Sequence, residues 1–386
     1  MMRKNHKKWL AALSAAAVLT VTGLVWADSG SDAAAPAGGG DASAAAPAGA
    51  DASASAPASG GDASASAPAS GDAATPPAPP VKPQRSEMEP LTASSLILSV
   101  ANDGDHLVAV GARGAVIVSN NGKDWAQVQT PVRATLTSVY FVDDKNGWAV
   151  GHDATILHTT DGGKTWQLQN FHPELEKPFL QVLFNDANNG IAVGAYGLIE
   201  KTNDAGQTWT AVDAPSILAD GLHLNSITKL GNGSLLIAGE QGLLGLSADG
   251  GATWEKLPPT YDGSLFGALP VGQSGALIYG LRGNVFMTQD VKSNKWTKID
   301  TGTVSSFFGG TILPDGQMVL VGLAGTIIEI NSVTGTVKPI TITKPVMDNG
   351  KEKQEVVTST LSSVIPFGNG ILVTGALGVQ TLAQLQ

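Results

Sequence analysis

The stretch Leu136–Gln169 reads LTSVYFVDDKNGWAVGHDATILHTTDGGKTWQLQ and contains four short apolar runs separated by turn residues. The runs are rich in β-branched, aliphatic and aromatic residues, and Gly, Asp and Asn bound them. Runs of this kind between turn residues are typical of β-strands joined as hairpins. The stretch therefore predicts one four-stranded antiparallel sheet.

The glycine that closes the second run of this stretch recurs along the chain. Its spacings are 40, 43, 45, 41, 42 and 53 residues, and an insertion, Pro345–Thr360, explains the last. The recurring positions are Gly111, Gly151, Gly194, Gly239, Gly280, Gly322 and Gly375. Seven repeats of one period with four strands each predict an all-β, seven-bladed β-propeller with four-stranded blades.

The end of the chain predicts how the ring closes. The last unit, Leu361–Gln386, contains only three strand-like runs. We expect its fourth strand to come from Arg85–Thr92, because pairing of the N- and C-terminal strands would remove exposed sheet edges.

The first 27 residues have a basic head, an apolar run of about eighteen residues and a small residue, Ala27, at the end. This pattern predicts a signal peptide and export to the periplasm. The run is also long enough to span a bilayer, so an uncleaved anchor in the inner membrane, with the chain facing the periplasm, is the alternative. The sequence has no cysteine, which excludes an acylated lipoprotein, a disulfide framework and a thiolate metal site.

Residues 28–84 consist mainly of Ala, Ser, Pro, Gly and Asp, with the unit DASxxAPA repeated. Such a segment cannot bury enough apolar surface to offset its chain entropy, so it predicts a disordered tether. The propeller is expected to occupy residues 85–386.

Charge and motifs exclude several functions. Without the four basic residues of the leader, the chain has 19 basic and 33 acidic residues, a net charge of −14, which disfavours nucleic acid as a partner. The sequence has no G-x-S-x-G elbow, no H-E-x-x-H, no phosphate-binding loop and no paired histidines at ligand spacing. We therefore expect no cofactor, no metal and no catalytic residue.

The turn TTDGGKTW (159–166) recurs as TNDAGQTW (202–209) and SADGGATW (247–254) and resembles the Asp-box, or BNR repeat, of sialidases and other propellers. Its Asp can accept hydrogen bonds from turn amides, and its Trp can pack between neighbouring blades. A cation site is the alternative, although the surrounding Gly, Lys and Thr offer few ligands. The structural interpretation covers Asp161, Trp166, Asp204, Trp209, Asp249 and Trp254.

The opposite end of the propeller should carry the turns between second and third strands and the connections between blades. The repeats contain only three arginines, and all three fall there. Solvated turns are one interpretation, and a surface whose arginines bind carboxylates of a partner is the other. The candidate binding residues are Arg113, Arg133, Arg282, His152, Asp153, Tyr196, Glu240 and Gln241. The connection 339–363 should add a mobile flap to this face with Lys344, Lys351 and Lys353.

The units GWAVGHDATILHTTDGGKTW and GIAVGAYGLIEKTNDAGQTW resemble the photosystem II assembly/stability factor family. The resemblance covers about residues 91–386 and implies a non-catalytic assembly factor that binds membrane-protein segments through an arginine-bearing face. The leader and tether resemble those of a Gram-negative periplasmic protein. The expected client is therefore an envelope membrane-protein complex, with a transporter of the resistance–nodulation–division (RND) type as the specific candidate.

A glycan-binding or sialidase-like glycoside hydrolase propeller is the rival hypothesis. Tyr196, Glu240, Asp153 and the three arginines supply the residue types that a sialidase requires. The Arg-Ile-Pro motif of sialidase catalytic domains is absent, and blades 1 and 5 lie far apart around the ring.

Overall fold

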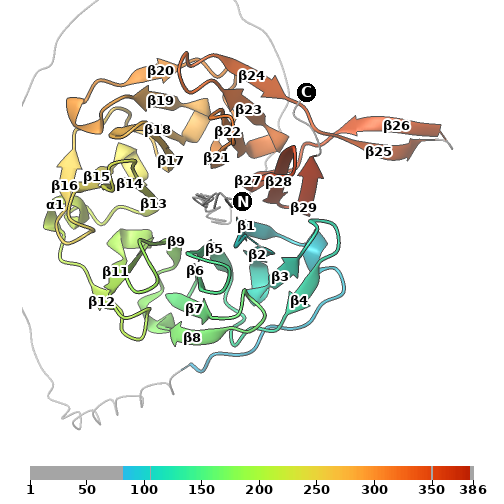
Figure 1. Cartoon of the computed structure of the whole chain (residues 1–386), viewed down its shortest axis with the longest axis horizontal. Coiled ribbons are helices and arrows are strands. Elements are labelled where there is room, and N and C mark those ends of the chain that lie inside the picture. The colour runs from blue at the N-terminus through green and yellow to red at the C-terminus, as the bar shows by residue number, and fades with distance from the viewer. Residues whose placement is uncertain (1–80, 105, 349–350, 383–386) are drawn as a thin grey trace, which may run out of the picture. The chain divides into compact units, whose positions relative to one another are not determined.

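The structure of the chain, a computed structural model, describes residues 81–104, 106–348 and 351–382. It is a ring of seven antiparallel sheets around a central axis, as the repeats predict (Figure 1). No helix of the described residues is long and apolar enough to cross a bilayer. The predicted leader, and the tether up to residue 80, lie outside the described residues.

Each blade takes its strands in chain order from the axis outward (Figure 1). Blade 1 contains β1 (Ile97–Asn102), β2 (Leu107–Gly111), β3 (Val116–Ser119) and β4 (Ala126–Val128), and blade 2 contains β5 (Leu136–Phe141), β6 (Gly147–Gly151), β7 (Thr155–Thr159) and β8 (Gln167–Asn170). Blade 3 contains β9 (Phe179–Phe184), β10 (Gly190–Gly194), β11 (Ile199–Thr202) and β12 (Thr210–Ala211), and blade 4 contains β13 (Leu224–Lys229), β14 (Leu235–Gly239), β15 (Leu244–Ser247) and β16 (Glu255–Leu257).

Blade 5 contains β17 (Leu265–Val271), β18 (Gly275–Gly280), β19 (Val285–Thr288) and β20 (Thr297–Ile299), and blade 6 contains β21 (Phe307–Ile312), β22 (Met318–Gly322), β23 (Ile327–Ile330) and β24 (Val337–Ile340). Blade 7 contains β27 (Leu361–Phe367), β28 (Gly370–Gly375) and β29 (Gly378–Leu382). The helical turns are η1 (Thr92–Ser94), η2 (Ala112–Gly114), η3 (Pro173–Leu175), η4 (Ala195–Gly197), α1 (Pro215–Leu218), η5 (Glu240–Gly242), η6 (Leu281–Gly283), η7 (Val291–Ser293) and η8 (Leu323–Gly325).

The hydrophobic core is divided among the junctions of the ring. Between each pair of neighbouring blades, the described residues form an apolar cluster with side chains from both sheets. A blade is therefore covered on both faces, which explains why its inner strands are nearly continuous apolar runs. Each sheet therefore relies on two neighbours to cover its apolar faces.

The recurring glycine ends the second strand of every blade, as predicted. A Cβ on Gly322 would overlap the carbonyl oxygen of Ser306, which leads into β21, and a Cβ on Gly111 would overlap that of Leu96. The close approach of two backbones explains why glycine occupies this position in all seven blades.

A bulge near the start of each innermost strand was not predicted. The register shifts there in every blade, for example between Leu136 and Ser138. In three blades the bulged residue is polar and hydrogen-bonds to the next blade. Thr137 Oγ1 donates to Phe179 O at 2.8 Å, and Asn225 Nδ2 donates to Leu265 O at 2.8 Å. The third, Ser362, links blade 7 to blade 1.

The predicted mode of ring closure is wrong. Within the described residues blade 7 has three strands, and Arg85–Thr92 adds no strand to it. Blades 7 and 1 instead meet through an apolar cluster that includes Val100 and Leu372, and Ser362 Oγ donates to Ile97 O at 2.8 Å. Closure by packing is sufficient because this junction is built like the other six.

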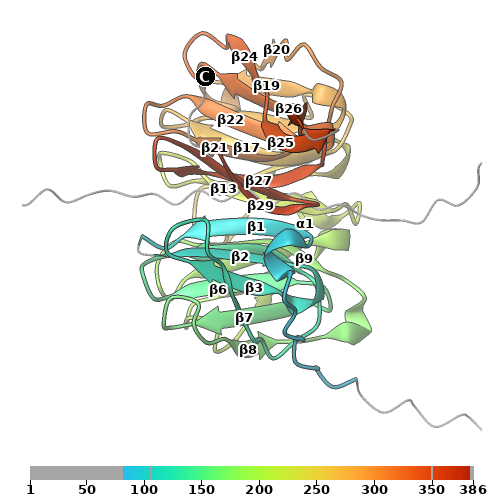
Figure 2. The same cartoon turned by 90° about the vertical axis from the view of Figure 1, so that its right-hand side faces the viewer.

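Residues 84–91, called here the lead-in, run along blade 1 from its outer rim towards the axis (Figure 2). The amide of Ser86 donates to Thr130 O at 3.0 Å, just after β4. Further on, a Cβ on Gly378 of blade 7 would overlap the carbonyl oxygen of Ala93 in η1. The segment expected to complete blade 7 therefore lies across one end of blade 1.

The insertion before blade 7 forms an antiparallel hairpin. Strands β25 (Thr343–Asp348) and β26 (Lys351–Val356) pair from Thr343↔Val356 to Asp348↔Lys351. The hairpin extends outward from the ring between blades 6 and 7 (Figure 1). The outer strand of blade 6 uses Val337–Ile340, so the connection to blade 7, expected over 339–363, begins after Ile340.

Candidate functional site

One end of the propeller, called here the arginine face, is formed by the turns between second and third strands and by the connections between blades. In six blades the turn holds a non-glycine residue with positive φ at its centre: Arg113 (58°), Asp153 (60°), Tyr196 (53°), Gln241 (52°), Arg282 (55°) and Ala324 (56°). Such a conformation costs roughly 1–2 kcal/mol for an L-residue, so the surroundings must impose it.

The contact that imposes this positive φ is made by the next residue of the turn. The glycine that follows packs on the connection to the next blade, where a Cβ on Gly114 would overlap Val132 O and a Cβ on Gly283 would overlap Thr303 O. The turns and the connections therefore lie side by side, as predicted, and the three arginines share one face of the ring.

Arg113 and Arg133 both hold carboxylates of the lead-in. Arg113 Nη1 lies 2.8 Å from Glu89 Oε1, and Arg133 Nη2 lies 3.1 Å from Glu87 Oε1. Arg113 comes from η2 and Arg133 from the connection between blades 1 and 2. These two arginines are therefore brought together on one segment of the chain, whereas Arg282 lies in η6 of blade 5.

The other candidates are distributed around the ring. His152 and Gln241 are exposed, and Asp153 is half-buried with its carbonyl accepting from His172 N at 2.7 Å. Tyr196 and Glu240 both contact His223 at the junction of blades 3 and 4. The Tyr196 ring lies edge-on to His223 at 4.6 Å, and His223 N donates to Glu240 Oε2 at 3.2 Å.

Sequence reasoning missed several residues of this face. His223 lies between Tyr196 and Glu240, and Lys177 Nζ donates to Tyr196 O at 3.2 Å. Glu87 and Glu89 were also missed, although their spacing in an extended segment was a usable signal, since alternate residues share one side of such a chain. The expected lysines lie on the hairpin, and Lys353 is exposed.

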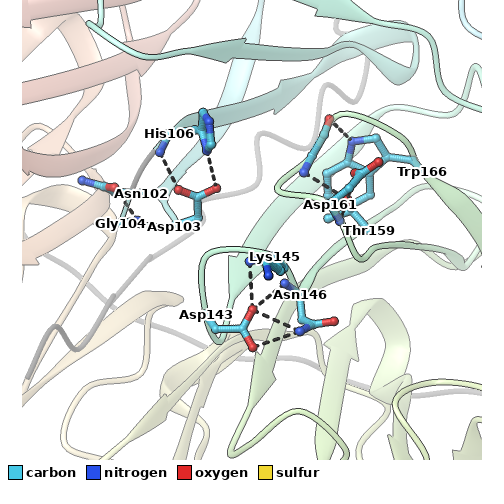
Figure 3. A network of polar contacts seen from close by, with 11 residues as sticks. Asn102, Asp103, Gly104, His106, Asp143, Lys145, Asn146, Thr159, Asp161 and Trp166 are labelled. Carbon is cyan, nitrogen blue, oxygen red and sulfur yellow. Dashed lines mark hydrogen bonds and ion pairs between the residues drawn. The ribbon is translucent and has the colours of Figure 1, made fainter.

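The opposite end of the propeller carries the Asp161, Asp204 and Asp249 turns. In the first, shown in Figure 3, Asp161 Oδ1 accepts from Thr159 Oγ1 at 2.8 Å. The same oxygen accepts from Thr165 N at 2.9 Å, and Oδ2 accepts from Thr165 Oγ1 at 2.6 Å. The other two turns repeat these bonds. Both carboxylate oxygens are thus used within the turn, which is the arrangement of a structural clip.

The tryptophan of each of these turns packs against the preceding blade. Trp166 joins the cluster of Val108 and Val110 in blade 1, and Trp254 joins that of Ile191 in blade 3. The half-buried Trp209 packs in the same way against blade 2. Turn and blade junction are therefore one unit: the hydrogen bonds shape the turn, and the indole fixes it to the neighbouring sheet.

We expect the Asp turns to make the stability of the fold depend on pH in the acidic range. The hydrogen bond from the Thr208 hydroxyl, followed by that from its amide, lowers the pKa of Asp204 from 3.8 to about 2, and Thr253 does the same to the pKa of Asp249. Because folding lowers these pKa values, their stabilisation is complete above about pH 4 and is lost as the pH falls towards 2. Melting temperatures from pH 5 to pH 2 should fall less steeply for Asp249→Asn than for the wild type. Parallel curves would contradict this prediction.

A sialidase-like centre needs three arginines on one substrate carboxylate, and the arginine face lacks this arrangement. Arg113 and Arg133 bind two different carboxylates on blade 1, and Arg282 lies in blade 5, three blades away around the ring. A hollow of about 440 Å³ lies at the base of the hairpin, lined among others by Thr301, Ile328 and Val357, and none of the candidate residues lines it.

The fold and the arginine face define a class, the seven-bladed propellers with Asp-containing turns at one end. Residues 117–298 and 169–335 match the family model "Photosynthesis system II assembly factor YCF48". The chain belongs to this family.

Relatives by sequence carry the same description. "Photosystem II assembly lipoprotein Ycf48" of Prochlorococcus marinus is 31% identical over 234 residues, which cover 59% of this chain and 68% of the relative. The protein of that name from Picosynechococcus sp. is 34% identical over 195 residues, which cover 50% and 55%.

A similar solved structure supports the fold. It is described as "YCF48 bound to D1 peptide", has a TM-score of 0.58 and 18% identity, and the match covers 77% of this chain and 98% of that one. At this identity the likeness concerns the fold alone.

Proposed function

We propose that this chain is a non-catalytic binding protein, an assembly or accessory factor for a membrane-protein complex of the envelope, and that it binds an acidic segment of its client through the arginine face. One observation carries the proposal: Arg113 and Arg133 each hold a separate carboxylate of one extended peptide segment. The face thus already performs, within the chain, the chemistry that capture of an acidic client segment requires.

Family membership supports an assembly role, since the relatives are named assembly factors and one solved neighbour is described with a bound peptide. The separation of Tyr196 and Glu240, at the junction of blades 3 and 4, from Arg113 and Arg133 on the lead-in favours binding over glycoside hydrolysis. The glycan-binding or sialidase-like alternative would require Arg113, Arg133 and Arg282 to converge on one ligand.

Export to the periplasm, or anchorage in the inner membrane facing the periplasm, is part of the proposal and rests on the leader sequence. An RND-type transporter is the specific client proposed, and a photosystem II protein is the client that the names of the relatives favour. Mass spectrometry of captured protein distinguishes the two.

The test is capture from detergent-solubilised membranes of the source cells. Wild type should retain a membrane protein that a variant with Arg113→Ala, Arg133→Ala and Arg282→Ala does not. The matched control removes the same charge from three exposed lysines at the other end of the propeller, Lys123→Ala, Lys145→Ala and Lys164→Ala, and should retain the client. Equal capture by both variants, or turnover of sialosides by the wild type, would refute the proposal.

A further inference from the structure

The lead-in is held on blade 1 by a set of hydrogen bonds, most of them to its main chain. Gln127 in β4 is the centre of this set, because its Nε2 donates to Glu87 O at 2.7 Å and its Oε1 accepts from Glu89 N at 2.7 Å. Ser86 N donates to Thr130 O at 3.0 Å, and Thr130 N donates to Ser86 Oγ at 2.8 Å. Paired backbone contacts of this kind recognise an extended peptide by its main chain.

Two ion pairs hold side chains of the lead-in. Glu87 and Glu89 are two residues apart, so their carboxylates lie on the same side of the extended segment and meet Arg133 and Arg113. Arg133 Nη1 also lies 3.5 Å from Gln84 Oε1. Together, Arg113, Gln127, Thr130 and Arg133 form a strip, called here the blade 1 strip.

The lead-in has no apolar anchor. Its large apolar side chains remain exposed, Met88 by 55% and Leu91 by 75%, as does Val81 just before it by 67%. Within the lead-in only the polar Ser86 is buried, and the next buried residue is Thr92, which opens η1. Polar contacts and exposed ion pairs contribute little each, so the segment can detach without uncovering the core.

We propose that the blade 1 strip is a receptor for an extended peptide of the pattern Ser-Glu-x-Glu, that residues 86–89 are its resident ligand within the chain, and that an acidic client segment binds there only by displacing them. This inference rests on the proposed function for the identity of the competitor. The resident segment is covalently attached, and attachment by a short flexible chain corresponds to an effective concentration of about millimolar. A client must therefore exceed that competition through additional contacts elsewhere on the arginine face.

The contacts define which residues the strip accepts. The position of Glu89 must supply an N–H, which excludes proline. The side chain of Met88 is 55% exposed, so this position should accept side chains of different size and polarity. The position of Ser86 is buried and needs a short side chain with an acceptor oxygen. Acidic residues are required at the remaining two positions for pairing with arginine.

The first experiment uses a fluorescein-labelled peptide with the sequence of residues 84–92, QRSEMEPLT, titrated with the full chain. The variant Glu87→Gln/Glu89→Gln weakens the resident segment and should bind the peptide about two- to thirtyfold more tightly than the wild type, the range expected for two exposed ion pairs. Adding Arg113→Ala and Arg133→Ala to that variant should abolish binding. A peptide with both glutamates changed to glutamine is the ligand control.

Three results overturn the proposal. They are equal affinity of wild type and Glu87→Gln/Glu89→Gln, binding that survives loss of both arginines, and absence of binding to Glu87→Gln/Glu89→Gln up to about millimolar peptide. Absence of binding is decisive because the attached segment has an effective concentration of about millimolar, and a sequence that does not bind at that concentration would not stay docked within the chain.

A second measurement follows the resident segment directly. The chain has no cysteine, so Met88→Cys accepts a single nitroxide label at an exposed position. The label should be largely immobilised, and Arg113→Ala/Arg133→Ala should at least halve the immobilised fraction. An unchanged spectrum refutes docking by the arginines, and an immobilised fraction that rises with protein concentration refutes docking within one chain.

Neither measurement contains a membrane protein, so their outcomes are separate from those of the capture experiment. Peptide binding without client capture refutes the proposed function and keeps the receptor. Client capture that Glu87→Gln/Glu89→Gln leaves unchanged keeps the proposed function and refutes displacement.

Discussion

Replacing Gly322 by alanine is expected to lower the free energy of unfolding by about 3 kcal/mol, the upper part of the range for overpacking at a site that cannot relax. A Cβ at this position would overlap the carbonyl oxygen of Ser306 and come within 2.9 Å of Phe307 Cα. Both atoms belong to backbone, so no side-chain rotation relieves the contact. The strand β21 would have to move away from β22, and with it the innermost strand of blade 6.

Gly316→Ala is the matched control because it lies in the same blade. Gly316 has a φ of 86° and open space around its missing side chain, so alanine there meets strain without a clash. Its expected cost is about 1 kcal/mol. Urea denaturation of both variants compares the two effects, and a loss at Gly322 no greater than that at Gly316 would refute the role of close backbone approach.

Replacing Trp148 by alanine should be at least as damaging, with a loss of about 3–5 kcal/mol. Trp148 of β6 is fully buried and lies between two rings at the junction of blades 2 and 3. Phe184 stacks on it at 3.5 Å between ring centroids, and His158 stacks on it at 4.5 Å. Alanine would leave a cavity that separates blade 2 from blade 3, and a ring of blades cannot close up around such a gap.

Trp148→Phe separates packing from polarity in the same position. The indole N–H of Trp148 is buried without a hydrogen-bond partner among the described residues, so its removal costs nothing in hydrogen bonding. Phenylalanine keeps a stacked ring and should lose only about 1–2 kcal/mol. Denaturation midpoints that place the alanine and phenylalanine variants together would show that the stack does not hold this junction.

Periodicity predicted the architecture because a propeller repeats one local solution. Each repeat contains the sequence signals for its own strands, turns and closing glycine, and those signals lie within about 42 residues of one another. The position of Gly322 at the end of β22 was predictable for this reason, and so was the gathering of Arg113, Arg133 and Arg282 on one face, since strand alternation decides at which end a turn lies.

The contacts between segments were not predictable in the same way. The pairing of Arg85–Thr92 with blade 7 was inferred from strand counting, but that segment has no alternation of buried apolar residues to fill a strand position. Its serine, glutamates and exposed Met88 suit a polar surface instead, and the side chain of Gln127 provides one. The bulges escaped prediction because nothing in Leu136–Ser138 distinguishes a shifted register from a regular one.

The sequence by itself determined the class of fold, the number of blades and the end of the ring at which each turn lies, because these depend on local periodicity. Only the tertiary structure decided that blade 7 meets blade 1 by packing and that Glu87 and Glu89 already bind two of the three arginines. Those features join residues that are far apart in the chain and carry no shared pattern. Their partners are chosen by the space and the unpaired polar groups that the folded ring leaves available.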